Sequence, residues 1–257
     1  MTETVDLFGL RIAKVSNSEA IDLIGDLVAE GRRSGTTHQV ATVNVDFLVN
    51  ADRDPTVAAA LRGADVCLAD GMPLVWASRL FRRRLPERVA GADLVPRLIA
   101  ESAERGWRIH VFGSQPHVAQ RAREWIESNH PGAAVSIDPG PILNDPTNVD
   151  PDVIASIAAA DADILCVALG NPKQERLIAT YRQQFGTPVQ IGIGGSLDML
   201  VGERRRAPRW VQRAGLEWVF RAAQEPARLG PRYLRDIRRF APLLWREYRR
   251  SRHGAGQ

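Results

Sequence analysis

The sequence predicts an α/β fold: a Rossmann-like, mostly parallel sheet of about six strands with helices on both faces, followed by a helical, basic C-terminal appendage. The first observation is that short apolar runs rich in β-branched residues alternate with helix-like segments. The second is the length of 257 residues, which suits one substantial α/β domain with an addition. The third is a hydrophobic fraction of 44% with 25% charged residues, which excludes disordered, collagen-like and disulfide-scaffold classes.

The strands come first in this prediction. Residues 7–15 alternate apolar and polar side chains and predict a short strand or hairpin. Six apolar runs then follow, at 39–43, 66–69, 109–112, 134–137, 164–169 and 189–193. Runs that are apolar on both faces are typical of parallel strands covered by helices, and such sheets bind ligands at the carboxyl ends of their strands. We therefore expect the site among the residues that follow each strand.

Helices are expected between these runs. Residues 16–32 place apolar side chains at helical spacing, and further helical segments are expected at 56–61, 73–80, 93–105, 116–128, 151–160 and 173–185. From Gly202 onward the strand signal stops, and Arg, Trp and Leu recur in segments 208–214, 216–224 and 233–250. We expect a catalytic domain over residues 1–202 and a helical appendage over residues 203–257, called the appendage below.

Charge is unevenly divided between these two parts. Residues 204–257 hold 15 of the 34 basic and 4 of the 30 acidic residues, so the rest of the chain is acidic, with 26 acidic against 19 basic residues. A basic segment of this kind indicates an anionic partner: nucleic acid, phospholipid headgroups or a phosphorylated substrate.

The N-terminal residues lack the features of a signal peptide, and no apolar run approaches the ~20 residues that span a bilayer. Cys67 and Cys166 lie in apolar runs and are expected to be buried strand thiols in a reducing compartment. Neither they nor the five histidines show metal-ligand spacing, so we expect no metal site and no cofactor. These features predict a cytoplasmic protein unless a surface holds it.

Asp70 follows a buried strand and precedes Gly71. A partly desolvated carboxylate at a strand end can take a proton from an attacking hydroxyl. Asp70 could equally be the N-cap of the helix that Pro73 begins.

The segment from Gly170 to Glu175 is a strand-to-helix turn whose free backbone N–H groups suit a phosphate, with Lys173 adding positive charge. A plain Gly/Pro turn is the alternative.

Residues 192–195 lack the spacing of a dinucleotide fingerprint, yet their glycines would let backbone approach a nucleotide. Similarly, Arg88 is either an anion clamp or a surface arginine, and Asp93 could start the helix after it.

Several segments carry, in order, a resemblance to the WecG/TagA/CpsF glycosyltransferase family from about residue 7 to residue 235. They are Thr42-Val43-Asn44, Ala69-Asp70-Gly71, Glu87-Arg88-Val89-Ala90-Gly91-Ala92-Asp93, Leu169-Gly170-Asn171-Pro172-Lys173-Gln174-Glu175, Gly192-Ile193-Gly194-Gly195-Ser196-Leu197-Asp198, Arg206-Ala207-Pro208, Gly215-Leu216-Glu217-Trp218, Arg221, Glu225-Pro226 and Arg228.

The resemblance implies an inverting glycosyltransferase that moves a hexose, of N-acetylmannosamine, mannosaminuronate or glucose type, from a UDP-sugar to a polyprenyl-diphosphate-linked sugar without an obligatory metal. It places the protein at the inner face of the cell membrane, in cell-envelope or exopolysaccharide synthesis. Asp70 then matches the proposed base, and the appendage closes over the site. The matching substrate-binding residues are Thr42, Asn44, Arg88, Gln174, Arg221, Arg228 and Arg232. For the nucleotide we expect Gly113, Gly170, Lys173, Glu175, Gly194, Gly195 and Asp198.

An alternative function remains: a Rossmann-like protein that binds nucleotides or nucleic acid through its basic appendage. The aromatic residues among the appendage's arginines, such as Trp210, Trp218 and Trp245, favour an anionic membrane surface over nucleic acid. In residues 228–250, apolar side chains recur at three- and four-residue steps beside arginines: Leu229, Tyr233, Ile237, Phe240, Leu244 and Tyr248. This stripe predicts a membrane-docking amphipathic helix, or else a helix packed on the body with a solvated basic face. A homo-oligomer is compatible with either interpretation.

Overall fold

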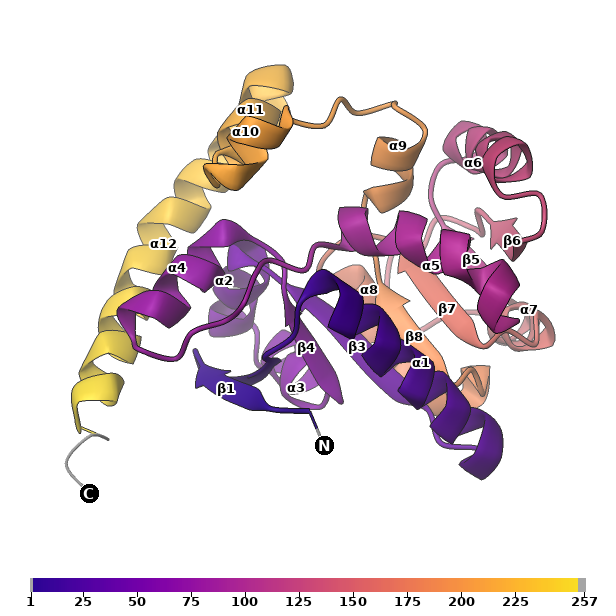
Figure 1. Cartoon of the computed structure of the whole chain (residues 1–257), viewed down its shortest axis with the longest axis horizontal. Helices are drawn as coiled ribbons and strands as arrows, with labels where there is room; N and C mark the ends of the chain where they lie inside the picture. Colours follow the sequence, from indigo (N-terminus) through magenta and orange to yellow (C-terminus); the bar gives the residue numbers. More distant parts are fainter. Residues whose placement is uncertain (1, 254–257) are drawn as a thin grey trace.

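The sheet has eight strands in the order β1-β2-β4-β3-β8-β7-β5-β6, which confirms the α/β class (Figure 1). A computed structural model describes residues 2–253, apart from the side chains of residues 209, 213, 228 and 253. β1 pairs with β2 antiparallel, and the remaining neighbours pair parallel. The strands are β1 Thr4–Leu7, β2 Leu10–Ala13, β3 His38–Val43, β4 Val66–Ala69, β5 Arg108–Gly113, β6 Ala134–Asp138, β7 Ile164–Ala168 and β8 Val189–Gly192.

Each of the six expected apolar runs forms a strand. The N-terminal alternating segment, residues 7–15, contains the turn and the second strand of the β1–β2 hairpin, whereas most of β1 lies before it. Its turn residues Phe8 and Gly9 both have positive φ, 56° and 75°. Two positive φ values in a two-residue loop match the twist of a tight hairpin. This hairpin accounts for the two strands beyond the six predicted runs.

The helices match most of the expected segments. Two were not predicted: α2 Val45–Arg53, which begins directly after β3, and the short α9 Ser196–Leu200. The others are α1 Asn17–Ser34, α3 Pro55–Arg62, α4 Met72–Leu80, α5 Gly91–Arg105, α6 Pro116–Asn129, α7 Pro151–Ala159, α8 Lys173–Phe185, α10 Arg209–Arg213, α11 Glu217–Gln224 and α12 Pro226–His253.

Helices cover both faces of the sheet because successive residues of each strand point to opposite sides. Val40 and Leu68 lie in a core cluster with residues of α1, α5, α6 and α9. The neighbouring residues Ala41 and Cys67 lie in a second cluster with residues of α2, α3 and α4. A third cluster packs α7 and α8 on β5 and β7. The central strands are therefore apolar on both sides, as their sequences predict.

Both cysteines are buried strand residues, as expected, with 3% of Cys67 and 1% of Cys166 exposed. They are free thiols. Burial raises the pKa of each thiol to about 12, so both are protonated near neutral pH.

The C-terminal helices α10, α11 and α12 pack on the rest of the chain, with α12 running along its side (Figure 1). Phe240 is 9% exposed and joins the core cluster of α2, α3 and α4 together with Leu244 and Tyr248. Its ring centroid lies 5.5 Å from that of Phe8. α12 continues through Pro231 and Pro242.

The apolar stripe predicted to dock on a membrane thus largely faces the body, which is the alternative that the sequence left open. Leu229, at the start of the stripe, is also buried, whereas Ile237 within it is exposed. The exposed apolar residues of α12 are Leu234, Ile237 and Trp245. Between residues 2 and 253, no helix combines the length and apolar character needed to cross a bilayer.

The start of the appendage docks on α4 through a glycine. Gly215, with φ 71°, lies between α10 and α11, and a Cβ on it would come within 2.8 Å of the Met72 Cβ and closer still to the Trp76 ring. A side chain would therefore collide with α4, so this turn requires glycine for both its φ and its close approach.

Candidate active site at the carboxyl edge of the sheet

Asp70 lies at the end of β4, where the parallel strands present their carboxyl ends. Its backbone N–H donates to the carbonyl of Val43 at 2.7 Å, which holds it beside the end of β3. The N-cap of α4 is Gly71, with no side-chain capping bond, so Asp70 is not the helix cap that the sequence allowed. The half-buried carboxyl group of Asp70 has no hydrogen-bond partner among the described residues. It is therefore free to accept a proton or a hydrogen bond from a substrate.

The surroundings of Asp70 change its acidity. Burial raises the pKa of its carboxyl to about 6; Arg88 and Arg221 oppose the rise, and the negative charges of Glu217 and Asp93 add to it. A pKa near the operating pH is what a general base needs, because the group is then mostly ionised and still basic enough to take a proton.

Arg88 is a half-buried clamp between acidic side chains, not a free surface arginine. Its Nη1 donates to Glu217 at 2.5 Å, and its Nη2 donates to Asp93 at 3.0 Å. Arg206 of the appendage also donates to Asp93, at 2.5 Å. Asp93 does not start α5, which begins at Gly91 after the N-cap Ala90. The four charges join the catalytic domain to the appendage beside Asp70.

Thr42 and Asn44 lie at the end of β3, next to Asp70. The buried Thr42 hydroxyl donates to the Gly192 carbonyl at 3.2 Å and so ties β3 to β8. The Asn44 side-chain oxygen caps α2 by accepting from the Phe47 N–H at 3.3 Å. Its amide nitrogen has no partner in the described part of the chain. Thr42 is placed as a positioning residue, whereas Asn44 can still donate to a ligand.

Gln174 and Glu175 contact the glycine-containing loops that follow β7 and β8. The Gln174 side-chain oxygen accepts from the N–H groups of Gly170, at 3.1 Å, and Gly194, at 2.8 Å, which links the loops after β7 and β8. Its amide nitrogen donates to Glu175 at 2.7 Å. Both side chains are buried, and burial raises the pKa of Glu175 to about 7. Through these hydrogen bonds the two residues hold the loops after β7 and β8 together.

The other expected nucleotide residues lie along the same edge. The Lys173 ammonium donates to the Leu143 carbonyl at 2.6 Å, so in this structure it fastens the loop after β6. Gly113 ends β5 with φ 96°. Asp198, in the first turn of α9, lies 3.8 Å from Arg204, and a Cβ on Gly195 would meet both side chains within 3.0 Å. Of these glycines, Gly113 and Gly195 lie against neighbouring side chains, whereas a Cβ on Gly170 would have nothing within 4 Å, so Gly170 is the one that leaves backbone open at this edge.

The expected arginines of the appendage lie on α11 and α12. Arg221 is close enough to Asp70 to influence its pKa. The guanidinium of Arg232 lies 5.2 Å from the Tyr233 ring centroid, and its buried Nε has no hydrogen-bond partner within the described residues. Arg228 lies in α12, but its side chain is outside the described residues.

Sequence reasoning missed a second link between α12 and the sheet edge. Arg235 donates to Asp46 of α2 at 2.8 Å, and the other carboxylate oxygen of Asp46 accepts from Asn171 at 3.0 Å. It also gave no role to Glu217 or Arg206, although both lie in segments that carry the family resemblance. The signal available in the sequence was a carboxylate, that of Glu217, close to arginines that match the family.

Across residues 2–253, no group of three or more His, Cys, Asp or Glu side chains is arranged to hold a metal ion. The charged groups near Asp70 are instead arginines paired with carboxylates.

Comparisons with known proteins show the family of the chain. The model of the glycosyl transferase WecG/TagA/CpsF family matches residues 5–254. A protein of Bacillus subtilis strain 168 is 34% identical over 189 residues, covering 74% of this chain and 72% of that protein. A protein of Bacillus spizizenii strain W23 is 33% identical over 189 residues, which again cover 74% of this chain and 72% of that protein. Both are named N-acetylglucosaminyldiphosphoundecaprenol N-acetyl-beta-D-mannosaminyltransferase. With its site at the carboxyl edge and a match over nearly its whole length, the chain belongs to the WecG/TagA/CpsF family of glycosyltransferases.

Proposed function

We propose that this glycosyltransferase moves an N-acetylmannosamine-type hexose from a UDP-sugar to a polyprenyl-diphosphate-linked sugar, with inversion, in cell-envelope synthesis. The names of both relatives support this donor sugar over a mannosaminuronate- or glucose-type sugar, and they support an acceptor carried on a lipid diphosphate. The family match also favours a transferase over the nucleotide- or nucleic-acid-binding alternative.

The observation that carries the proposal is the unpartnered Asp70 carboxylate, with its pKa raised to about 6. In the proposed step the acceptor hydroxyl attacks the anomeric carbon from the face opposite to UDP. The new C–O bond forms as the bond to the UDP oxygen breaks, the hydroxyl proton passes to Asp70, and UDP leaves with the electron pair. One displacement with one base gives inversion.

The departing diphosphate needs positive partners. The Gly195 backbone N–H, which makes no hydrogen bond with a described residue, and arginines that the appendage brings to the edge supply such partners in this proposal. We therefore expect no obligatory metal, and turnover in EDTA should match turnover with Mg²⁺. Loss of activity in EDTA that Mg²⁺ or Mn²⁺ restores would contradict this part.

The appendage supplies the site for the acceptor diphosphate in this proposal. Arg221 acts on Asp70 electrostatically, and the buried Nε of Arg232 lacks a partner among the described residues. An unsatisfied buried donor costs free energy that an anionic ligand would recover. We assign Arg221 and Arg232 to the diphosphate, with Arg228 as a further candidate.

We further propose that the protein is held peripherally at the inner membrane face. Trp245 is 62%, Ile237 53% and Leu234 50% exposed on α12, among its arginines. Exposed aromatic and aliphatic side chains beside arginines suit the headgroup region of an anionic leaflet.

The direct test is an assay with a panel of UDP-sugars and a short-chain, diphosphate-linked N-acetylglucosamine acceptor in solution. We expect turnover with UDP-N-acetylmannosamine, and Asp70→Asn should lower it by ~10²–10⁴-fold while UDP still binds. A variant that keeps more than about a tenth of the wild-type rate at saturating substrate would refute the base assignment. UDP binding without turnover on any donor would support the nucleotide-binding alternative.

A further inference from the structure

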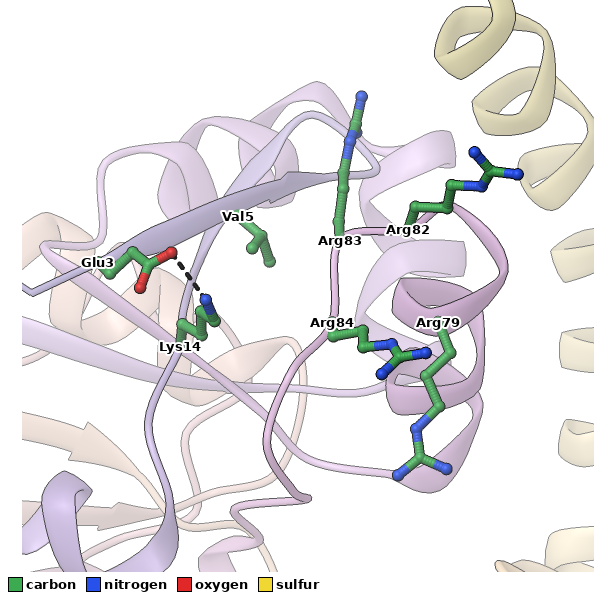
Figure 2. A pocket seen from close by; sticks show the side chains of 7 residues that line it. All are labelled: Glu3, Val5, Lys14, Arg79, Arg82, Arg83 and Arg84. Carbon is green, nitrogen blue, oxygen red and sulfur yellow. Dashed lines mark hydrogen bonds and ion pairs between the residues drawn. The ribbon is translucent and has the colours of Figure 1, made fainter.

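A basic hollow lies outside the candidate active site, between the β1–β2 hairpin and the end of α4 (Figure 2). Its volume is about 590 Å³. Lys14 and Glu3 line it from the hairpin side, and four arginines line it from the end of α4 and the turn that follows. These are Arg79, Arg82, Arg83 and Arg84. Five cationic side chains therefore surround the hollow against one carboxylate; below it is called the basic hollow.

Three of the four arginines have no ionic partner in the described part of the chain. Arg83 is paired with Glu247 of α12 at 2.8 Å, and Lys14 is paired with Glu3 at 2.8 Å. Arg79, Arg82 and Arg84 are exposed, and their side chains make no ion pair or hydrogen bond with a described residue. Three uncompensated positive charges around one hollow repel one another unless an anion binds there.

Exposed apolar side chains border these arginines. Leu80 is 64% exposed and Trp76 is 43% exposed, and both lie on α4. Large apolar side chains exposed beside a cluster of arginines are typical of a surface that meets lipid headgroups and the top of the acyl chains. A site for free phosphate or a nucleotide would have no need of them.

The basic hollow also lies next to the appendage. Trp76 lies against Gly215 at the turn between α10 and α11. At the other end of α4, the Arg83–Glu247 pair connects the turn to α12. α4 and the turn after it thus contact the appendage, for which we propose a membrane contact.

We propose that the basic hollow binds the phosphate groups of anionic phospholipids, with Leu80 entering the headgroup region, as a membrane contact on the catalytic domain itself. The inference rests on the proposed function insofar as a lipid-linked acceptor places the protein at a membrane. It adds a second attachment point, so that both α4 and the appendage orient the carboxyl edge toward the bilayer.

The test compares two matched double variants by sedimentation with vesicles of phosphatidylcholine alone or mixed with phosphatidylglycerol. Arg79→Gln/Arg84→Gln removes two charges from the basic hollow. Arg33→Gln/Arg97→Gln removes two exposed arginines from α1 and α5 that make no ion pair with a described residue, so the net charge is equal. If each arginine contributes about fivefold near an anionic surface, the first variant should bind phosphatidylglycerol vesicles about 25-fold more weakly, and the second less than about twofold more weakly.

Two further measurements separate lipid binding from attraction by net charge and from a site for free phosphate. Leu80→Gln, at an exposed position, should weaken vesicle binding at fixed charge. Inorganic phosphate, added at constant ionic strength, should leave vesicle binding unchanged. Equal losses in the two double variants, no loss in either, or displacement by inorganic phosphate would each overturn the proposal.

Turnover with the short-chain acceptor in solution separates this inference from the proposed function. Arg79→Gln/Arg84→Gln should retain the wild-type rate in that assay, since these residues lie outside the candidate active site. Absence of turnover in the wild type would refute the proposed function and leave the vesicle result standing. Loss of turnover in this variant, with the far-UV circular dichroism of the wild type, would show that the arginines serve the reaction instead, and would overturn the lipid assignment.

Discussion

The Arg88 Nη1 and the Glu217 Oε2 lie 2.5 Å apart, although 129 positions separate them in the sequence. Arg88 belongs to the catalytic domain and Glu217 to the first turn of α11. Both charges act on Asp70, in opposite directions. The position of the appendage is therefore coupled to the acidity of the proposed base.

Glu217→Gln should shift the pH dependence of the reaction. Without the negative charge of Glu217, the pKa of Asp70 should fall, because Arg88 and Arg221 then act on it with less opposition. We expect the acidic limb of kcat/KM to move to lower pH. Glu203→Gln, which removes a carboxylate paired with Arg121 instead, should leave the limb in place. An unchanged limb in Glu217→Gln would show that the pair serves only to hold the appendage.

For the wild type, kcat/KM should rise with pH through about 6 and then level off. The reason is that the base works only when ionised, and the pKa of Asp70 is raised to about 6. Below that pH the rate should fall about tenfold per pH unit. A flat profile down to pH ~4.5, with substrate binding unchanged, would contradict a base with this pKa.

Asp70→Asn should stabilise the fold at neutral pH. The pKa of Asp70 is raised in the folded protein, so its stability contribution is fully present below the unfolded pKa and is lost as pH rises through about 6. About two pKa units correspond to at most about 3 kcal/mol, and we expect about 1–2 kcal/mol because the group is half-buried. Urea unfolding at pH 8 should show this gain and unfolding at pH 4 should not; a gain of equal size at both would point to another cause.

Gly192→Ala should destabilise the protein. A Cβ on Gly192 would lie 2.6 Å from Glu175 Oε1 and closer still to the Gln174 amide nitrogen. We expect a loss of about 1–3 kcal/mol in unfolding free energy, since both side chains are buried. Gly230→Ala is the matched control: nothing lies within 4 Å of its Cβ position in α12, so alanine there should stabilise by about 0.5–1 kcal/mol. The same sign for both variants would contradict the close approach at Gly192.

Arg221→Gln and Arg232→Gln should raise KM for a diphosphate-linked acceptor by about 10–100-fold. The same variants should discriminate less between diphosphate and monophosphate acceptors. Arg239→Gln, at an exposed position of the same helix α12, is the control and should change neither value. Unchanged acceptor KM in both test variants would remove these arginines from the acceptor site.

The sequence predicted the sheet and the carboxyl edge on which the candidate site lies because both depend on local patterns. Apolar runs mark the strands, and polar or glycine residues directly after them mark the carboxyl edge. Asp70 could be placed for that reason. α2 was missed because Phe47, Leu48 and Val49 form an unbroken apolar run with no helical spacing, and its cap Asn44 was interpreted as a ligand residue.

Contacts between distant segments were beyond such patterns. The partners of Arg88 and the buried link between Gln174 and Gly194 depend on how the loops fold together. The direction of the α12 stripe depends on Phe8 and the α2–α4 cluster, which offer it an apolar surface to cover. For the same reason, truncation after Glu203 would expose the core around Phe240, and point variants test the appendage more cleanly.

The two buried thiols make the protein convenient for site-specific labelling. Cys67 and Cys166 are 3% and 1% exposed and, with a thiol pKa of about 12, hold almost no thiolate at neutral pH. A maleimide probe should therefore leave the native protein unmodified and react with a cysteine introduced at an exposed site, such as Leu80→Cys or Trp245→Cys. Fluorophores at those two sites can report how deeply α4 and α12 each enter a bilayer, with no need for a cysteine-free background. Once the chain unfolds, the same two native thiols become reactive, so their labelling rate measures global opening.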